Sequence, residues 1–466
     1  MTTRTNRSTQ AGPTRREQLT AIAATLFARD GYHNVTVGDI AAAAGLSGPA
    51  IYRHFPGKQA ILAEVVRSGF DEMARAVAAD LAGEWEGAGG DAEVGAEAEG
   101  EAASATAVPA SAGSSGMAAT SGSARRLRTV YRDLAAFVIR RPEFGVMWRR
   151  EYRHLAPSDA AELAKRMGQA SDTAVVEIRR LRPDLPADDA ELLSWAALSV
   201  LGSISDHRVR LPRVAFEELL AGIAMDVVST ELTEANSDNR PQESTPKDRR
   251  EKILAAAARL FWDRGYHAVT MEEIGAAAGI AGPSIYSHFA GKTDLLRTIT
   301  ERIGERLRLT LTEGAAASAA ETSASADASP VRDRATGQAG DPSASTPPTE
   351  SLSALAARYI STVRTSRDLV AAYFTEGHNL PDRDRADTRR FQRAYTAHWA
   401  ALLSSARPDL SPEEIRIRVL AAFAVVNDTA RTRRLMDRPG LAGQLRAVML
   451  AVLLTPTSGA RDVNRC

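Results

Sequence analysis

Apolar side chains recur at helical spacing along most of this 466-residue chain. Near the N-terminus the i, i+3, i+4, i+7, i+8 spacing of one buried helix face is met by Leu19, Ile22, Ala23, Leu26 and Phe27. No segment shows the sustained apolar–polar alternation between turn residues that is typical of strands. The pattern therefore predicts an all-α fold with essentially no sheet.

Cap and breaker residues mark the expected helix ends. Thr36 is followed three residues later by Asp39, which is the spacing of a capping box. The same spacing recurs at Thr270 and Glu273. Ser411 stands before a proline and two glutamates, as at a helix start. Further helix boundaries are indicated by the prolines between periodic runs, namely Pro142, Pro183, Pro212, Pro408, Pro412 and Pro439.

The chain repeats itself. Residues 15–62 return as residues 249–296 without a gap, and roughly half of the aligned positions are identical. Further along, the Arg-Pro-Asp-Leu of 182–185 returns at 407–410 with a different offset. We interpret this as a tandem duplication. We call the N-terminal domain of each copy its head and the remainder its body.

Two tracts with few apolar residues interrupt the copies. Residues 83–124 are almost entirely Gly, Ala, Ser and Glu, and residues 314–349 are rich in Ala, Ser, Thr, Pro and Asp. Such tracts bury too little surface to offset the entropy of ordering, so we expect disordered linkers. The expected order is a disordered basic arm (1–12), first head (13–73), linker (83–124), first body (125–232), linker (233–246), second head (247–307), linker (314–349), second body (350–455) and tail (456–466).

Charge and cysteine content narrow the classes of protein to which this chain can belong. With 58 Lys+Arg and 58 Asp+Glu the net charge is zero, which argues against a uniformly basic nucleic-acid coat. The single cysteine, Cys466, excludes an intrachain disulfide and a cysteine-based zinc finger. No signal peptide or membrane span is evident, so we expect a cytoplasmic protein with no membrane partner. A local basic arm on the first head is formed by Arg4, Arg7, Arg15 and Arg16.

After Thr36 the sequence predicts two short helices joined by a tight turn. Gly45 can adopt the left-handed turn, and Ser47 is placed to cap the second helix. Ile51 and Phe55 are expected to pack inward. Small residues and donors suited to a duplex remain on the outward face, namely Ser47, Gly48, Ala50, Tyr52, Arg53 and His54.

These residues resemble the TetR family of bacterial transcriptional regulators. The family pattern is an aromatic-Gly-Tyr/Phe turn, a Thr-capped helix, a Gly turn, then Ile/Leu-Tyr-x-His-Phe and a lysine. The first copy meets it at Phe27, Gly31, Tyr32, Thr36, Ile40, Ala41, Gly45, Ile51, Tyr52, His54, Phe55 and Lys58. The second copy meets it at Phe261, Gly265, Tyr266, Thr270, Ile274, Gly279, Ile285, Tyr286, His288, Phe289 and Lys292, with Gly275 where the family usually has Ala.

The resemblance implies that each head is a three-helix, helix-turn-helix domain that binds a double-stranded DNA operator. Phosphate contacts would come from Tyr52, His54, Lys58, Tyr286, His288 and Lys292, with helix N-termini brought to the backbone by Thr36 and Thr270. Base contacts would come from Ser47, Gly48, Pro49, Ala50 and Arg53, and from Ala281, Gly282, Pro283, Ser284 and Ser287. Because Ser287 cannot bind guanine with two hydrogen bonds as Arg53 can, we expect unequal half-sites.

The bodies resemble the family's ligand-binding and dimerisation domain, with about five helices each. Their aromatic residues either pack in the core or line an elongated apolar pocket with a cationic mouth. The candidate pocket residues are Trp148, Arg149, Tyr152, Trp195, Phe374 and Trp399. Such a pocket suits an acyl-CoA, a fatty acid or a steroid-like acid. Glu151 and Glu376, near His154 and His378, are interpreted as structural, and we expect no metal and no cofactor.

The last two helices of each body are predicted at 187–205 with 213–230, and at 412–434 with 441–453. In the family, such helices form a four-helix dimer interface. Here either the two copies pair within one chain as a pseudo-dimer, or two chains pair as a homodimer. In the first case two recognition helices would lie about 34–36 Å apart.

The sequence thus predicts a transcriptional regulator, a repressor, that reads an imperfect palindrome and is released by a small apolar ligand. The expected linkers follow the helix that transmits ligand binding in the family, and would loosen that coupling. An alternative is a ligand-sequestering or scaffold protein with only one DNA-competent head, which Ser287 favours. We expect no enzyme, because GxSxG, phosphate-loop and HExxH motifs and a cysteine nucleophile are absent.

Overall fold

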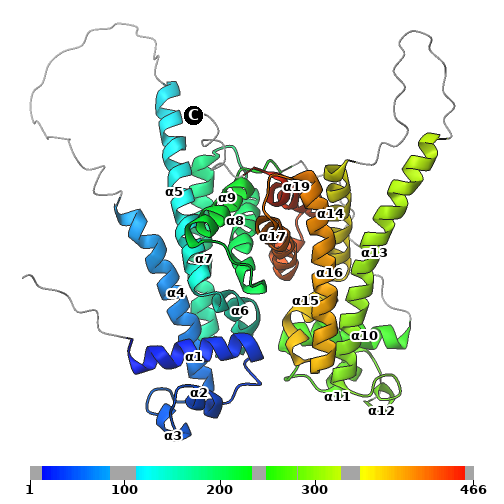
Figure 1. Cartoon of the computed structure of the whole chain (residues 1–466). Helices are drawn as coiled ribbons and strands as arrows, with labels where there is room; N and C mark the ends of the chain where they lie inside the picture. Colours follow the sequence, from blue (N-terminus) through cyan, green and yellow to red (C-terminus); the bar gives the residue numbers. More distant parts are fainter. Residues whose placement is uncertain (1–12, 84–111, 233–247, 281, 327–346, 457–466) are drawn as a thin grey trace, which may run out of the picture. The chain divides into compact units, whose positions relative to one another are not determined.

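The computed structural model describes residues 13–83, 112–232, 248–280, 282–326 and 347–456, and every regular element in these ranges is helical (Figure 1). The first copy contains α1 (Arg15–Asp30), α2 (Val37–Ala43), α3 (Gly48–Ile51), α4 (Lys58–Gly83), α5 (Ala112–Arg140), α6 (Glu143–Val146), η1 (Met147–Glu151), η2 (Tyr152–His154), α7 (Pro157–Leu181), α8 (Ala187–Gly202), η3 (Ser203–Asp206) and α9 (Arg213–Val228). The second contains α10 (Arg249–Arg264), α11 (Met271–Ala277), α12 (Gly282–Ile285), α13 (Lys292–Ala326), α14 (Pro348–Thr365), α15 (Arg367–Glu376), η4 (Gly377–Asn379), α16 (Asp382–Ala406), α17 (Pro412–Arg431), α18 (Arg433–Met436) and α19 (Leu441–Leu454). The all-α prediction is confirmed for the part of the chain that is described. Within the same part, no helix combines the length and apolar character needed to cross a bilayer.

The duplication is visible in the elements themselves. α1 and α10 each span 16 residues, α2 and α11 each span 7, and α3 and α12 each span 4. Both heads therefore repeat the same three-helix sequence of elements, as the aligned motifs predicted.

Helices reach further into the alanine-rich tracts than their composition indicated. α5 begins at Ala112 and α13 continues to Ala326, so parts of the expected linkers 83–124 and 314–349 are helical. Alanine has the highest helix propensity, and lengthening an existing helix requires no new nucleus. Other segments that we expected to lack structure lie outside the described residues: 1–12, 84–111, 233–246, 327–346 and 457–466.

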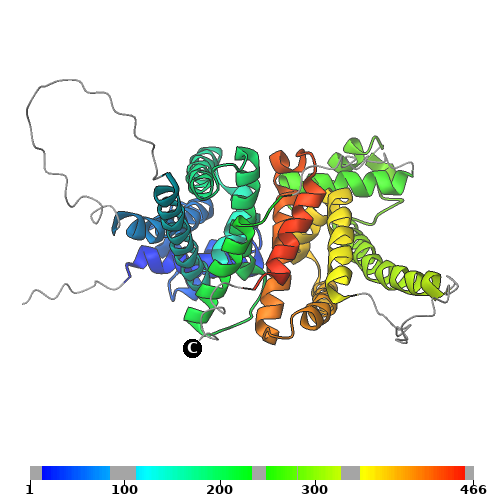
Figure 2. The same ribbon diagram turned by 90° about the horizontal axis from the view of Figure 1, so that it is seen from above.

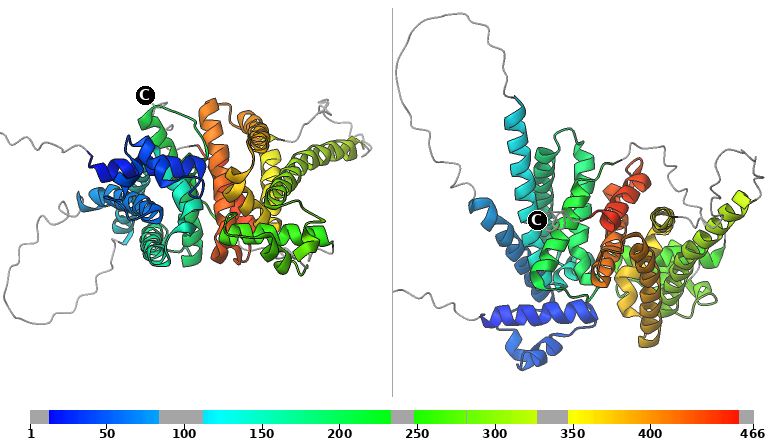
Figure 3. Two further views of the ribbon diagram at one scale, coloured as in Figure 1. Left: turned by 90° about the horizontal axis from the view of Figure 1, so that it is seen from below. Right: turned by 45° about the horizontal axis from the view of Figure 1, so that its top comes forward.

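The chain divides into two compact units. The first comprises the residues up to Ala74 together with Arg141–Met167, and holds the first head. In this head α1 lies across α2 and α3 (Figure 3), and α6 and η1 pack against α1. Gly69 of α4 lies directly against Phe144 of α6, because a Cβ there would lie 2.4 Å from the phenylalanine ring. A side chain at position 69 would therefore displace the phenylalanine.

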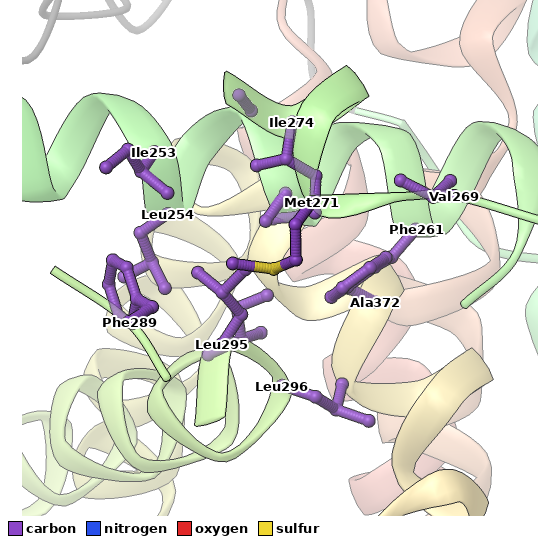
Figure 4. Close-up of a cluster of buried hydrophobic side chains, with 14 of the residues drawn as sticks. Ile253, Leu254, Phe261, Val269, Met271, Ile274, Phe289, Leu295, Leu296 and Ala372 are labelled. Atoms are coloured by element: carbon purple, nitrogen blue, oxygen red, sulfur yellow. The ribbon is translucent and has the colours of Figure 1, made fainter. Parts of the chain in front are cut away.

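The second unit comprises Arg75–Arg140 and the chain from Gly168 onward, and includes the whole second copy. The core of the second head contains Phe261, Ile274 and Phe289, and extends to Ala372 of α15 (Figure 4). The second head and second body therefore share one continuous hydrophobic core.

The four helices that the sequence singled out as pairing surfaces contact one another. α8 packs against α17 and α9 packs against α19 (Figures 1 and 2). Each of these four helices also carries apolar side chains with no exposed surface, including Leu193, Ile223, Val425 and Val448. In this structure the two bodies meet within a single chain.

His207, between η3 and α9, is kept neutral by its surroundings. Its Nδ1 accepts a hydrogen bond from the Val209 amide at 3.2 Å. Burial, together with the nearby cations Arg416 and Arg210, lowers the pKa of His207 to about 4. A protonated imidazole would therefore be poorly tolerated at this position.

We predict an acid-sensitive contribution from His207. The pKa of its ring falls from 6.5 in the unfolded chain to about 4 in the fold, so the native state binds fewer protons. The stabilisation is present above pH 6.5 and is lost as the pH falls towards 4, by up to about 3 kcal/mol. Chemical denaturation between pH 7 and 4 should show a smaller loss for His207→Asn, whose amide oxygen replaces the acceptor. Parallel pH profiles for the two proteins would contradict this.

Candidate nucleic-acid interface

Each head starts its helix-turn-helix with the predicted capping box. The Thr36 hydroxyl accepts from the Asp39 amide at 3.1 Å, and the Asp39 carboxylate accepts from the Thr36 amide at 2.8 Å. The bond from that amide is the main reason why the pKa of Asp39 is lowered. Thr270 and Glu273 repeat the arrangement. The start of α2 and of α11 is thus fixed by local sequence.

A left-handed glycine ends this helix in both heads. Gly45 has φ +67° and Gly279 has φ +69°, a conformation that side chains with a Cβ rarely adopt. Gly275, where the family usually has Ala, also has a structural reason. A Cβ at position 275 would lie 3.1 Å from the carbonyl oxygen of Ile280 in the turn. The second head therefore makes a closer turn at this point than alanine would allow without a shift.

In the first head, the candidate recognition helix is α3. One side of this segment packs into the head and the other side is exposed. Ile51 and Phe55 are buried, as predicted, whereas Tyr52 is 59% exposed and Arg53 is also exposed. Ser47 occupies the N-cap position, but its side chain makes no capping hydrogen bond, contrary to our expectation. The helix has only four residues, and Pro49 already lies in its first turn, so the cap contributes little to it.

In the second head, the candidate recognition helix is α12. It has the same length as α3, but the residues on its outward face differ. Tyr286 is 51% exposed, and its hydroxyl donates to Glu272 at 3.3 Å. The Ser287 hydroxyl donates to the carbonyl of Ser284 at 2.7 Å. Ala281 lies outside the described residues, and Gly282 and Pro283 belong to α12. His288 is half-buried, like His54 in the first head.

The lysine that follows each motif bonds to the head itself. Lys58 Nζ donates to the carbonyls of Tyr32 and Val35, both at 2.9 Å, and lies 4.4 Å from the centre of the Tyr32 ring. Lys292 Nζ donates to the Tyr266 carbonyl at 2.8 Å and lies over its ring. Partial burial lowers the pKa of both lysines. Sequence reasoning assigned these lysines to phosphate alone and missed this structural role.

Two arginines that we placed in the basic arm belong to α1. Arg15 donates to the carbonyl of Ala44 at 2.7 Å, and Arg16 donates to that of His54 at 2.8 Å. Arg16 also lies 4.3 Å from the centre of the Phe55 ring. They therefore hold the helix-turn-helix to α1 instead of extending from it, and Arg4 and Arg7 lie outside the described residues.

A buried glutamate joins each head to the adjoining helices of its body. Glu151 and Glu376 are each only 1% exposed. Glu151 accepts from the Tyr32 amide at 3.1 Å, and Glu376 accepts from the Tyr266 amide at 3.2 Å. These were the glutamates that the repeat marked as structural, and the structure supplies their partners.

The predicted pocket residues have several different environments. The Trp148 and Tyr152 rings are in tilted contact with centres 4.6 Å apart, and the Tyr152 hydroxyl donates to the Ala160 carbonyl. Trp399 has no exposed surface and packs against Tyr359. Arg149 and Trp195 are half-buried, and Phe374 is 40% exposed. Trp399 is thus a core residue, which was the simpler interpretation.

One cleft of about 120 Å³ opens between α13, α15 and α16. None of the predicted pocket residues lines it. Its lining combines aromatic and charged side chains, including Arg297, Arg308, Tyr373, Asp384 and Phe391. Ligand pockets are typically about 300–1,000 Å³, so this cleft is small for an acyl or steroid-like ligand. No cluster of three metal-ligating side chains occurs among the residues that the structure describes.

We predict that Lys292 stabilises the second head in the absence of DNA. Lys292→Met removes the bond to the Tyr266 carbonyl and the cation–ring contact, and should cost about 1–2 kcal/mol. Calorimetry of the free protein measures the loss as a lower unfolding temperature. Lys252→Met, which changes an exposed lysine on α10, is the matched control and should have little effect. Equal unfolding temperatures for the two variants would leave Lys292 with no structural role.

Comparison with known proteins agrees with the duplicated head. The family model described as "Bacterial regulatory proteins, tetR family" matches residues 19–65 and again residues 253–299. The model described as "Tetracyclin repressor-like, C-terminal domain" matches residues 345–431 in the second body.

Curated relatives match over a length close to one head. The HTH-type transcriptional activator FasR of Mycolicibacterium smegmatis is 43% identical over 65 residues, which is 14% of this chain and 30% of FasR. The HTH-type transcriptional repressor KstR2 of Rhodococcus jostii is 44% identical over 59 residues, which is 13% of this chain and 29% of KstR2. The chain therefore spans less than a third of the length of these relatives.

Among solved structures, the TetR family regulator PfmR from Thermus thermophilus is similar over 45% of this chain and 96% of its own. The identity is 18% and the TM-score is 0.33. The two matches to the tetR family model fall on the two heads, each of which carries the same capped helix and glycine turn, so both heads are similar to that family.

Proposed function

We propose that this chain is a DNA-binding transcriptional regulator, a repressor, whose two heads read the halves of an imperfect palindrome. The observation that carries the proposal is the same in both heads. A short helix is anchored by a buried Ile and Phe, and presents an exposed tyrosine on its outward side. An exposed aromatic with a polar tip, beside small residues, suits close contact with a DNA backbone.

The proposed contacts divide by chemistry. Tyr52, His54, Tyr286 and His288 would donate to phosphates, while the N-termini of α2 and α11 would face the backbone. Lys58 and Lys292 would add phosphate contacts through the N–H groups that the head leaves unused. Base contacts are assigned to Ser47, Gly48, Pro49, Ala50 and Arg53, and to Ala281, Gly282, Pro283, Ser284 and Ser287.

Pairing of the two bodies supports the proposal that a single chain binds one operator with both of its heads. Because α8 and α9 pack against α17 and α19, both faces that would join two separate subunits are already occupied. A single chain would then supply both heads to one operator. A homodimer of chains would require either a different surface or exchange of these helices.

The effector we propose is a small apolar molecule of the acyl or steroid-like acid class. Aromatic packing around Trp399 fills the interior of the second body, and the cleft of about 120 Å³ is smaller than such a ligand needs. We therefore place effector binding in the first body, with Trp148, Arg149 and Tyr152 as the lining. Binding would favour a conformation with lower affinity for DNA.

One observation favours a second candidate, a ligand-sequestering or scaffold protein with one DNA-competent head. The Ser287 hydroxyl already donates to the Ser284 carbonyl, so it offers less to a base than Arg53 does. Against this candidate, the second head retains Tyr286, His288 and Lys292 at the positions of their first-head counterparts.

Solution mass by light scattering, with and without DNA from upstream of the protein's own gene, tests the proposal. We expect the mass of one chain, and one chain added per DNA duplex at low salt. Binding should weaken at moderate salt because phosphate contacts displace counterions. If no complex forms with this DNA or with any member of a random-sequence pool, the regulator proposal fails.

Exchange of one residue between the heads tests half-site reading. Arg53→Ser should lose discrimination at one guanine by about 1–3 kcal/mol, and Ser287→Arg should gain it in the other half-site. Sequence selection with the double exchange is expected to invert the operator preference. An operator preference that is the same for wild type and both variants would show that position 53 does not read bases.

A further inference from the structure

The short segment 433–438 of the second copy carries arginines that point to different partners. We call it the arginine segment; it includes α18 and the two residues after it. Arg433 contacts α10 of the second head, whereas the adjacent Arg434 contacts α8 of the first copy. Two neighbouring side chains thus hold a DNA-binding head and the pairing surface of the other copy.

On the head side, Arg433 holds the last turn of α10. Its guanidinium lies 2.6 Å from the Asp263 carboxylate and 5.4 Å from the centre of the Trp262 ring. Arg367 of α15 lies 4.5 Å from the same ring and donates to the Ala430 carbonyl at 3.0 Å. The end of α10 is therefore contacted by cations from both the arginine segment and α15.

On the side of the first copy, Arg434 pairs with Glu191 and lies 5.7 Å from the centre of the Trp195 ring. Arg438 pairs with Asp189, and the two side chains are only 12% and 21% exposed. Gln444 adds a bond to Asp189 at 3.3 Å. Because the Asp189 pair is shielded from solvent, it is worth more than an ordinary surface ion pair.

The first copy cannot form the reciprocal link. The connection before the last helix differs in length between the copies, because α8 and α17 start 225 residues apart (412 − 187) whereas α9 and α19 start 228 residues apart (441 − 213). The first copy has no helix equivalent to α18 in this connection. The heads align with an offset of 234 residues (249 − 15), so Trp262 and Asp263 correspond to Ala28 and Arg29. Ala28 offers no ring and Arg29 no carboxylate, so the end of α1 lacks both groups that Arg433 contacts on α10. The link exists in one direction only.

We propose that the arginine segment is a positioning element that ties the second head to α8 of the first copy. Adjacent residues of one short helix cannot move independently, so a shift of α8 is passed to the end of α10. This inference rests on the proposed function for its purpose: an effector whose binding shifts α8 would reposition the second head. The mechanical tie itself stands without DNA.

Hydrogen exchange of the full chain, measured by mass spectrometry without DNA, tests the tie. The double variant Asp189→Asn, Glu191→Gln removes the two carboxylates of α8 that pair with the arginine segment. Both residues are far in sequence from the second head. We expect exchange in residues 249–264 of α10 to become about twofold to fivefold faster, the effect of losing ion pairs of this exposure. Arg433→Gln removes the ion pair with Asp263 of α10. It should give the same change in α10 without affecting α8.

Two matched variants serve as controls. Asp188→Asn alters an exposed carboxylate on the same helix as Glu191, and Arg208→Gln alters an exposed arginine in the connection before α9 of the first copy. Neither should change exchange in α10. If hydrogen exchange in α10 is the same in the double variant as in the wild type, the proposed link between α8 and α10 is wrong, whatever the exchange in α8. A failure to bind DNA would overturn the proposed function and leave the exchange result unaffected.

Discussion

The backbone of one tyrosine in each head is held from two sides, and the arrangement of the head depends on it. In the first copy, Lys58 donates to the carbonyl of Tyr32, and Glu151 accepts from its amide. Lys292 and Glu376 hold Tyr266 in the same way. The lysine stands at the start of the long helix after the helix-turn-helix, and the glutamate belongs to the body. The turn between the first two helices is therefore the point where head and body are joined, in both copies.

The two copies retain this joint and diverge elsewhere. Around the first joint, Arg150 donates to the carbonyls of Phe27 and Ala28, and residues 147–151 form a π-helix. In the second copy the equivalent stretch stays α-helical, and Asn379 supplies the extra bond to Glu376. Duplication thus preserved the scaffold of the head while the contacts around it changed. This divergence is what permits unequal roles for the two halves of one chain.

Unequal copies in one chain make contacts that a symmetric dimer cannot make. In a symmetric dimer each contact is made twice, so neither half can specialise. Here the contacts between copies run from arginines of the second to carboxylates of the first, while the second-copy counterpart of Glu191 is Arg416. Under the proposed function, a chain built this way would respond at one body and read different bases at each head.

Local sequence accounts for most of the fold and for the outline of the site. Helical periodicity, the capping boxes at Thr36 and Thr270 and the glycine turns at Gly45 and Gly279 need only neighbouring residues, so they could be predicted. The candidate recognition residues followed from the same local motifs. Alanine-rich helix ends at Ala112 and Ala326 were missed, because composition was weighed there without helix propensity.

Contacts between distant parts of the chain could not be predicted. Nothing near Lys58 or Arg16 in sequence shows that they bond to backbone carbonyls 26 and 38 residues away. Asp189 and Arg438 are 249 residues apart, so their pairing exists only once two bodies have packed. The sequence by itself determined the helices, the duplication and the identity of the heads, because these depend on local spacing. Only the tertiary structure decided which charged groups bind the chain itself, because that choice depends on which surfaces meet.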